Sequence, residues 1–303
     1  MHKTTELLDK YGLCPKKYTI IKSVKLIDTD HGTFVMKPKK RMDKSNVYQY
    51  LLSRNFDCFP RPINDINHDS YEIFPYVIEF TMPKEQKAVD LMYLMSLLHN
   101  KTTFYKEVDL DDVKNFYEET SSKLQYLEQY YFDLQNTIEN NVYMSPSEYL
   151  LMRNISRIYS AIYFCKNALE HWYQLITSKK NQRYVMTHNA LELNHFIKSE
   201  HAYLISWDHA KIDLPIYDFY HFYKRHYYDL DFVSLLQIYE SKYPLLEEEK
   251  TLLFLLLSIP EKIVLDQEEF KKCQEISEFF IYMDKTNALI SKQNTNQAHE
   301  QTA

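Results

Sequence analysis

Residues that could do chemistry gather between positions 184 and 219. Two short apolar runs, Tyr184–Met186 and Tyr203–Ile205, flank a polar loop, which is the pattern of two buried strands that present a loop. Glu192 lies within that loop, and Asp208 follows the second run. Magnesium prefers hard oxygen ligands such as carboxylates, so this stretch is where metal-dependent chemistry would take place.

The same stretch resembles the catalytic segment of the kinase-like phosphotransferase superfamily, which includes the aminoglycoside and choline kinases. The nearest subgroup in this resemblance is the bacterial spore-coat CotS type. The superfamily's catalytic loop reads H-x-D-x-x-x-x-N, and its metal segment reads I-D-W-E-x-A-x-x-G-x-P-x-x-D. The framework positions of both patterns are present in this chain: His188, Ile205, Trp207, Ala210, Pro215 and Asp218.

Three positions that carry the superfamily's chemistry hold other residues here. Ala190 stands at the catalytic aspartate, His195 at the asparagine and Ser206 at the magnesium-binding aspartate. The loop aspartate orients the attacking hydroxyl and accepts its proton, a role worth roughly 10²–10⁴-fold in rate, and a methyl group cannot perform it. Ser206 offers a neutral hydroxyl, and the imidazole of His195 suits softer metals than magnesium. The resemblance therefore implies the framework of a phosphotransferase without its catalytic groups.

Two carboxylates could replace the missing ones. Asp208 stands where the superfamily has glutamate and is the candidate metal ligand, while Glu192 lies in the catalytic loop. Each also has a simpler interpretation, with Asp208 capping a loop and Glu192 as a solvated charge. Both interpretations remain open at this point.

Composition argues against several classes of function. The net charge of −6 provides no basic field that would attract nucleic acid. The chain has only 2 glycines, far apart at Gly12 and Gly32, so it has no glycine-rich loop to surround phosphates. Its 4 cysteines lack C-x-x-C spacing, which favours reduced thiols in the cytoplasm over a zinc site. The most apolar run, residues 251–260, is too short to cross a bilayer, so no membrane partner is expected.

The first 80 residues predict a small antiparallel sheet with two short helices. Residues that favour strands alternate with polar ones, and turn residues separate the runs. The helices are expected near 4–11 and 45–54. The five expected strands lie near 18–22, 24–29, 33–37, 63–66 and 71–78.

Lys37 matches the lysine that, in the superfamily, extends from the third strand to the nucleotide phosphates. That lysine normally pairs with a glutamate on the following helix, yet residues 45–54 contain no acidic side chain. A desolvated lysine without a carboxylate is poorly oriented and costly to bury. The sequence therefore predicts that the nucleotide site has lost this pair as well.

Helices dominate the rest of the chain. Apolar residues from Val113 to Ile138 recur at steps of three, four and seven, which is typical of one helical face. Ser145, Pro146 and Glu148 then form a capping box that starts a second long helix, so a helical hairpin is expected. Further helices are predicted near 86–99, 215–227, 231–239, 245–257 and 267–283.

These elements predict an α+β, bilobal protein-kinase-like fold. It consists of a small antiparallel-sheet N-lobe over residues 1–80, a large helical C-lobe with the long hairpin over 81–288, and a disordered polar tail over 289–303.

The leading functional hypothesis is a pseudokinase, a catalytically deficient member of the superfamily that serves as a binding or assembly protein. Its partner would be an unknown protein or small molecule, its location the cytoplasm, with a spore-coat association in sporulation implied by the CotS-like resemblance alone. One alternative is an active small-molecule phosphotransferase that uses Asp208 and Glu192. Another is an ATP-sensing pseudokinase that binds through Lys37. ATP and magnesium are the cofactors that the resemblance suggests, and the sequence establishes neither.

Overall fold

A computed structural model describes residues 2–21, 24–39, 45–64 and 69–300. The chain forms two compact units, each built from two separate stretches. The first unit comprises residues 1–102 and 186–212, and the second comprises 103–185 and 213–303. The boundary predicted near residue 80 lies inside the first unit, so the division at that point stays a prediction.

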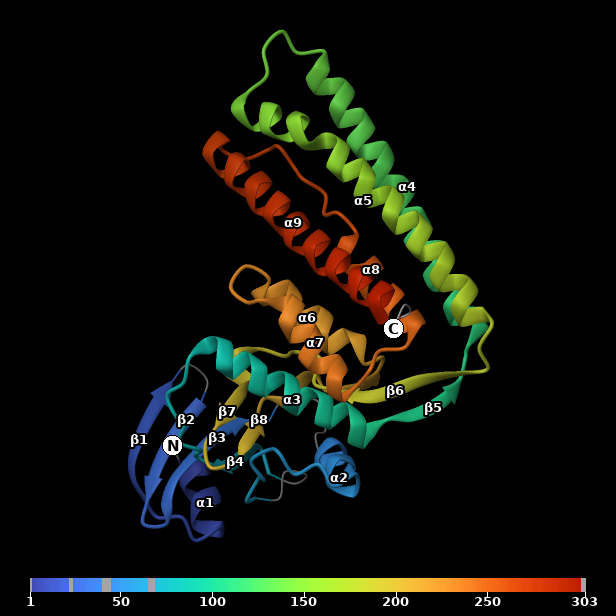
Figure 1. The fold of residues 1–303 in the computed structure, drawn as a ribbon. Helices are drawn as coiled ribbons and strands as arrows, with labels where there is room; N and C mark the ends of the chain where they lie inside the picture. The colour runs from blue at the N-terminus through green and yellow to red at the C-terminus, as the bar shows by residue number, and fades with distance from the viewer. Residues whose placement is uncertain (1, 22–23, 40–44, 65–68, 301–303) are drawn as a thin grey trace. The chain divides into compact units, whose positions relative to one another are not determined.

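The first unit contains a four-stranded antiparallel sheet (Figure 1). The four strands overlap four of the five that the sequence predicts, and each is antiparallel to its neighbour. The strands follow in the order β1 (Pro15–Ile21), β2 (Val24–Thr29), β3 (Gly32–Pro38) and β4 (Tyr71–Pro75).

The strand expected near 63–66 is not part of this sheet in the described residues, and 65–66 lie outside them. Asn64 takes the place of a neighbouring strand. Its side-chain oxygen accepts a hydrogen bond from the Ile73 amide at 2.8 Å, and its side-chain nitrogen donates to the Tyr71 carbonyl at 2.7 Å. The Ile63 amide donates to the Ile73 carbonyl at 2.9 Å. The Asn64 side chain and the Ile63 amide thus bond to the outward-facing backbone groups of Tyr71 and Ile73, so no further strand is needed at this edge of the sheet.

Helices and a small hairpin complete the first unit. Buried side chains from the first helix and the sheet pack together, and Gly12 ends that helix in the left-handed conformation at φ 68°. The two stretches of this unit are joined by backbone hydrogen bonds from Leu204 to Cys58 and from Phe80 to Lys198, both 2.8 Å. The elements are α1 (His2–Lys10), α2 (Ser45–Ser53), α3 (Lys84–Thr102), η1 (Leu193–His195), β7 (Phe196–Lys198), β8 (Ala202–Leu204) and η2 (Trp207–His209). Strand β9 (Lys211–Asp213) contains the boundary between the units.

The second unit begins with the predicted helical hairpin. Strand β5 (Phe104–Glu107) leads into α4 (Leu110–Glu139), and α5 (Pro146–Thr177) returns alongside it toward β6 (Asn181–Thr187) (Figure 1). Ser145 and Glu148 form the expected capping box, with Pro146 in the first turn. Most of the apolar side chains in the predicted stripes of both helices are buried, so the sequence pattern identified the packed faces correctly.

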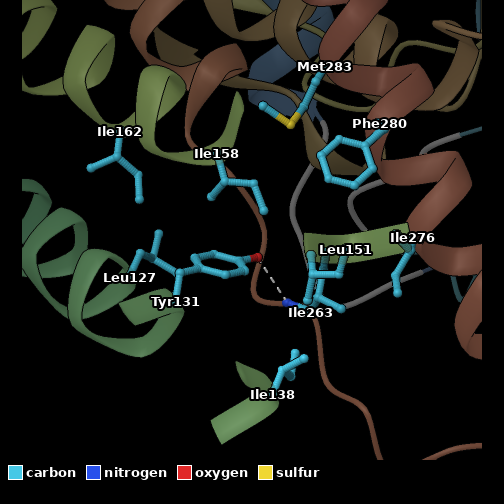
Figure 2. Packing of buried hydrophobic residues seen from close by; sticks show 10 residues of the cluster. All are labelled: Leu127, Tyr131, Ile138, Leu151, Ile158, Ile162, Ile263, Ile276, Phe280 and Met283. Atoms are coloured by element: carbon cyan, nitrogen blue, oxygen red, sulfur yellow. Dashed lines mark hydrogen bonds between the residues drawn. The ribbon is translucent and has the colours of Figure 1, made fainter. Parts of the chain in front are cut away.

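Helix α9 (Glu269–Glu300) closes the core of the second unit, together with α6 (Ile216–His226), α7 (Phe232–Lys242) and α8 (Glu247–Ser258). Figure 2 shows Tyr131 and Leu127 of α4 near Ile158 of α5, with Phe280 of α9 in the same cluster. The hydroxyl of Tyr131 accepts a hydrogen bond from the Ile263 amide at 3.2 Å, which fixes the loop before α9 onto this core.

Helix α9 extends past its predicted end at residue 283 and through most of the segment 289–303 for which the sequence predicts disorder. Leu289 and Ile290 are buried, because the apolar face continues for another two turns beyond Met283. In the described part of the chain, no helix combines the length and apolar character needed to cross a membrane.

Candidate functional site

The loop after β6 is held by a buried histidine. His188 is fully buried, and its Nε2 lies 2.8 Å from the carbonyl oxygen of Ile205. Because a carbonyl can only accept, Nε2 carries the proton and donates it. Asn189 follows with φ 57°, a left-handed conformation that asparagine tolerates well, and turns the chain toward Ala190. His188 thus ties the loop after β6 to Ile205, which follows β8, and its framework role stays a prediction.

A second histidine closes the loop from the other side. The Nδ1 of His195 lies 2.7 Å from the carbonyl oxygen of Ala190, so Nδ1 is protonated and donates to this carbonyl. The Ile205 amide donates to the His195 carbonyl at 2.9 Å. His195 therefore holds the loop in place through its Nδ1. At the position of the catalytic aspartate, the side chain of Ala190 is a buried methyl group.

Ser206 and Trp207 form a tight turn after β8. Ser206 has φ 66° and ψ 49°, a left-handed conformation that is uncommon outside glycine and in which aspartate and asparagine are enriched several-fold. Trp207 is buried, and its indole nitrogen donates to the Leu204 carbonyl at 3.0 Å. The backbone at 206 therefore has a geometry that suits the superfamily's aspartate better than the serine that occupies it.

The two substitute carboxylates lie in the first unit, in the 3-10 turns beside the loop. Asp208 is the second residue of η2, and Glu192 precedes η1, where its backbone carbonyl accepts from the His195 amide at 3.0 Å. Both side chains are half-buried. Among the residues that the structure describes, no group of three or more His, Cys, Asp or Glu side chains is arranged to hold a metal ion.

Lys37 has a carboxylate partner, which the sequence did not predict. Its Nζ lies 3.6 Å from Oε2 of Glu72, directly across the β3–β4 pair, and 5.1 Å from the centre of the Phe74 ring. The Glu72 side chain is 1% exposed and that of Lys37 is 19% exposed. The expectation of an unpaired lysine is therefore wrong. The partner comes from the adjacent strand, whose register cannot be read from the local sequence, and α2 indeed contains no acidic residue.

Tyr48 of α2 lies close enough to the carboxylates of Glu72 and Asp208 to be affected by their charges. Burial raises the pKa of the Tyr48 hydroxyl well above its ordinary value, and the negative charges of Glu72 and Asp208 raise it further. The hydroxyl consequently stays protonated at any physiological pH. Sequence reasoning missed both Tyr48 and Glu72, since a tyrosine in an apolar helix and a glutamate in a strand carry no signal of their own.

An unbroken series of aromatic rings connects Tyr48 with the catalytic loop. Tyr48 stacks on Phe59 at 5.0 Å between ring centres, and Phe59 contacts Trp207 edge-on at 6.2 Å. Trp207 in turn lies 5.0 Å from the His188 ring. Such rings pack best in offset or edge-to-face arrangements, as they do here. α2 and the loop that begins at His188 thus belong to one packed aromatic cluster within the first unit.

Asp218, the last framework residue, belongs to the second unit. It lies in the first turn of α6, three residues after Pro215, and is fully buried. Its burial agrees with a framework role, although its predicted function in supporting the catalytic loop stays a prediction.

No family model matches the chain, and no curated protein sequence matches it. Solved structures do resemble it. An aminoglycoside phosphotransferase from Alicyclobacillus acidocaldarius has a TM-score of 0.70 at 11% identity, over 97% of this chain and 96% of that one. Spectinomycin phosphotransferase in its AMP-bound complex has a TM-score of 0.54 at 14% identity, over 95% and 98%. The same enzyme with ADP and spectinomycin gives 0.51 at 12% identity, again over 95% and 98%.

These similarities establish the fold. The chain has the kinase-like fold of the aminoglycoside phosphotransferases, with a small antiparallel-sheet lobe and a helical lobe, as the sequence predicted.

Proposed function

We propose that this protein is a pseudokinase, a kinase-like phosphotransferase fold that no longer transfers phosphate and acts as a binding or assembly protein. The observation that carries the proposal is Ala190. The loop around it is intact, with both histidines bonded to backbone carbonyls, yet the side chain at its centre is a methyl group. A loop that keeps its shape without its base supports a role in binding rather than in catalysis.

The metal position supports the same proposal. Ser206 retains a backbone conformation suited to aspartate but presents a neutral hydroxyl. The protonated Nδ1 of His195 is committed to the Ala190 carbonyl, so this residue does not supply the oxygen ligand of the superfamily's asparagine. Magnesium would therefore depend on Asp208 and Glu192, which is the alternative of an active small-molecule phosphotransferase.

A second candidate function is favoured by one specific contact, the Lys37–Glu72 ion pair. A lysine held by a buried carboxylate is oriented, and an oriented ammonium group can bind phosphate oxygens. The spectinomycin phosphotransferase of similar fold was solved with AMP and with ADP. By this comparison the chain would sense ATP or ADP through Lys37 without turnover. The CotS-like resemblance adds a proposed place for either function in spore-coat assembly, from a cytoplasmic origin.

Nucleotide titration with and without magnesium separates these functions. A nucleotide present at about 100 times its dissociation constant should stabilise the fold by about 2.7 kcal/mol, which raises the melting temperature by several degrees. A shift that does not need magnesium and disappears in Lys37→Met supports the sensor. Lys114→Met, at an exposed lysine of α4, is the matched control and should keep the shift. No shift with any nucleotide leaves the binding or assembly protein as the better proposal.

A turnover assay tests the loss of catalysis. We expect no magnesium-dependent ATP consumption above background with a panel of hydroxylated and aminated small molecules. Consumption that vanishes in Asp208→Ala would contradict the proposal and make Asp208 the metal ligand. The reverse experiment introduces the two aspartates of the superfamily's patterns, Ala190→Asp and Ser206→Asp, into one chain. Aspartate suits the left-handed backbone at 206, so this variant should fold, and gain of magnesium-dependent nucleotide binding would show that the rest of the site persists.

A further inference from the structure

Strand β1 is an open edge of the sheet in the first unit. It is the outermost strand in the order β1-β2-β3-β4, as Figure 1 shows. Every side chain along it is at least partly exposed, including Tyr18 at 44% and Ile20 at 69%. An edge strand with exposed apolar side chains is a template for pairing with another strand.

The register identifies the backbone groups that this edge presents. Thr29 pairs with Gly32 across the two-residue turn of Asp30 and His31, so Thr29, Ile27 and Lys25 direct their backbone groups to β3. Leu26 and Asp28, which alternate with them, direct theirs to β1, where they pair with Thr19 and Lys17. Alternate residues of an antiparallel strand direct their backbone groups to the same neighbour. Thr19 and Lys17 therefore bond to β2, whereas Tyr18 and Ile20 direct their N–H and C=O groups away from the sheet. Within the described part of the chain, no backbone hydrogen bond reaches these outward groups of Tyr18 and Ile20.

The opposite edge of the sheet is closed. Asn64 and the Ile63 amide satisfy the outer backbone groups of Tyr71 and Ile73 on β4. A sheet with one open and one closed edge can pair with another chain only along its open edge. Pairing between two copies through their open edges would therefore end at a dimer and not continue into a fibre.

The strand is complementary to itself. Its first half carries Lys16 and Lys17, its second half carries Ile20 and Ile21, and Tyr18 lies at the centre. An antiparallel pair related by a two-fold axis at Tyr18 places Lys17 opposite Thr19 of the other copy, and Lys16, which lies at a shift in the register of β1, opposite Ile20. No lysine then lies directly opposite a lysine, and the long stem of Lys16 covers Ile20 while its charged end stays in water.

We propose that β1 pairs antiparallel with β1 of a second copy of this chain, with Tyr18 on the two-fold axis, to form an eight-stranded sheet. The two Tyr18 residues exchange both backbone hydrogen bonds, and their rings lie on the same face of the joined sheet. The contact is short, so we expect a weak dimer at micromolar concentration and not an obligate one. The inference does not depend on whether the protein binds nucleotide.

The first test is the mass in solution, by light scattering over a dilution series from about 1 µM to about 300 µM. We expect the mass to rise toward twice 36.7 kDa with concentration. Tyr18→Lys places two ammonium groups opposite each other on the axis and should weaken the dimer at least about tenfold. Ile78→Lys is the matched control, because Ile78 is 70% exposed and lies outside β1. A chain that is monomeric throughout, or a dimer that Tyr18→Lys leaves intact, would overturn the proposal.

The second test fixes the register by disulfide formation, in a Cys14→Ser background because Cys14 is exposed next to β1. Paired residues on the axis have Cα atoms about 5.5 Å apart, within the range of a disulfide, so Tyr18→Cys should form a covalent dimer under mild oxidation. Ile21→Cys is equally exposed at the surface but would lie about 20 Å from its counterpart and should not cross-link. Cross-linking by Ile21→Cys but not by Tyr18→Cys would refute this register. Equal melting temperatures of both variants before oxidation would show that the hairpin itself is intact.

Discussion

The ion pair between Lys37 and Glu72 offers the sharpest test of how the first unit is held together. At 3.6 Å and an effective dielectric constant of about 20, two unit charges attract each other by roughly 4–5 kcal/mol. Desolvation of both groups offsets much of this energy. Glu72→Gln removes the carboxylate from a lysine that is only 19% exposed, so we expect it to lower the free energy of unfolding by about 2–4 kcal/mol. The double variant with Lys37→Met should recover part of that loss.

A double-mutant cycle measures the coupling, and the chain provides a convenient probe. Its 2 tryptophans lie one in each unit, Trp207 in the first and Trp172 in the second. In a Trp172→Phe background, urea unfolding followed by fluorescence reports on the first unit alone, and we expect a coupling energy of about 1–3 kcal/mol.

The exposed pair of Lys16 and Asp30 in the same unit is the control, with side chains 65% and 55% exposed. Its coupling should not exceed about 0.5 kcal/mol, because solvent screens exposed charges. A coupling energy between Lys37 and Glu72 no larger than this, measured at a concentration where the chain is monomeric, would show that the pair does not stabilise the first unit.

Three further predictions concern other parts of the chain. Ser206→Gly should stabilise the protein by about 0.5–1 kcal/mol, because relief of the left-handed strain exceeds the added chain entropy, whereas Ser206→Val should destabilise it; unfolding in urea decides. Tyr131→Phe should cost about 1–3 kcal/mol, because the buried Ile263 amide loses its acceptor, and a variant as stable as the parent would contradict this. The Lys272 ammonium, with the backbone amide and hydroxyl of Ser147, lowers the pKa of Glu269 from 4.5 to about 2. Because this pKa is depressed by folding, its contribution to stability is complete above about pH 4.5 and is lost as the pH falls to about 2, so Glu269→Gln should match the parent at pH 2 and be less stable at pH 6.

Much of the fold could be predicted because its signals are local. The capping box of Ser145 and Glu148 marks the start of α5 within four residues, and the apolar stripe of the hairpin repeats over many turns. His188 and Trp207 stand out in the sequence by their spacing, and both are buried, while their framework role stays a prediction.

What could not be predicted depends on partners distant in the chain. Glu72 reaches Lys37 only through the register of β3 and β4, which is set by the packing of the whole sheet. Asn64 replaces a strand through its side-chain amide, and an alternating pattern cannot distinguish the two. The C-terminal limit of α9 was missed because a polar composition suggested disorder, although Leu289 and Ile290 continue its buried face.

The order of the two units along the chain has a consequence for folding. The first unit cannot be completed until residues 186–212 have been made, and the stretch 103–185 of the second unit separates them from residues 1–102. Closing a flexible loop of that length costs about 4 kcal/mol in entropy. Helices α4 and α5 are neighbours in sequence and can pair early, and the β5–β6 register then places Phe104 opposite Tyr184. The Met186 amide donates a hydrogen bond to Thr102 Oγ1 at 3.1 Å, although the two residues are far apart in the sequence. Once the hairpin has formed, only a short length of flexible chain separates them. The long hairpin thus reduces the length of flexible chain that must be closed when the first unit folds. Shortening the hairpin by whole turns should leave the first unit stable. Replacing it with a flexible linker of equal length should slow the refolding of that unit.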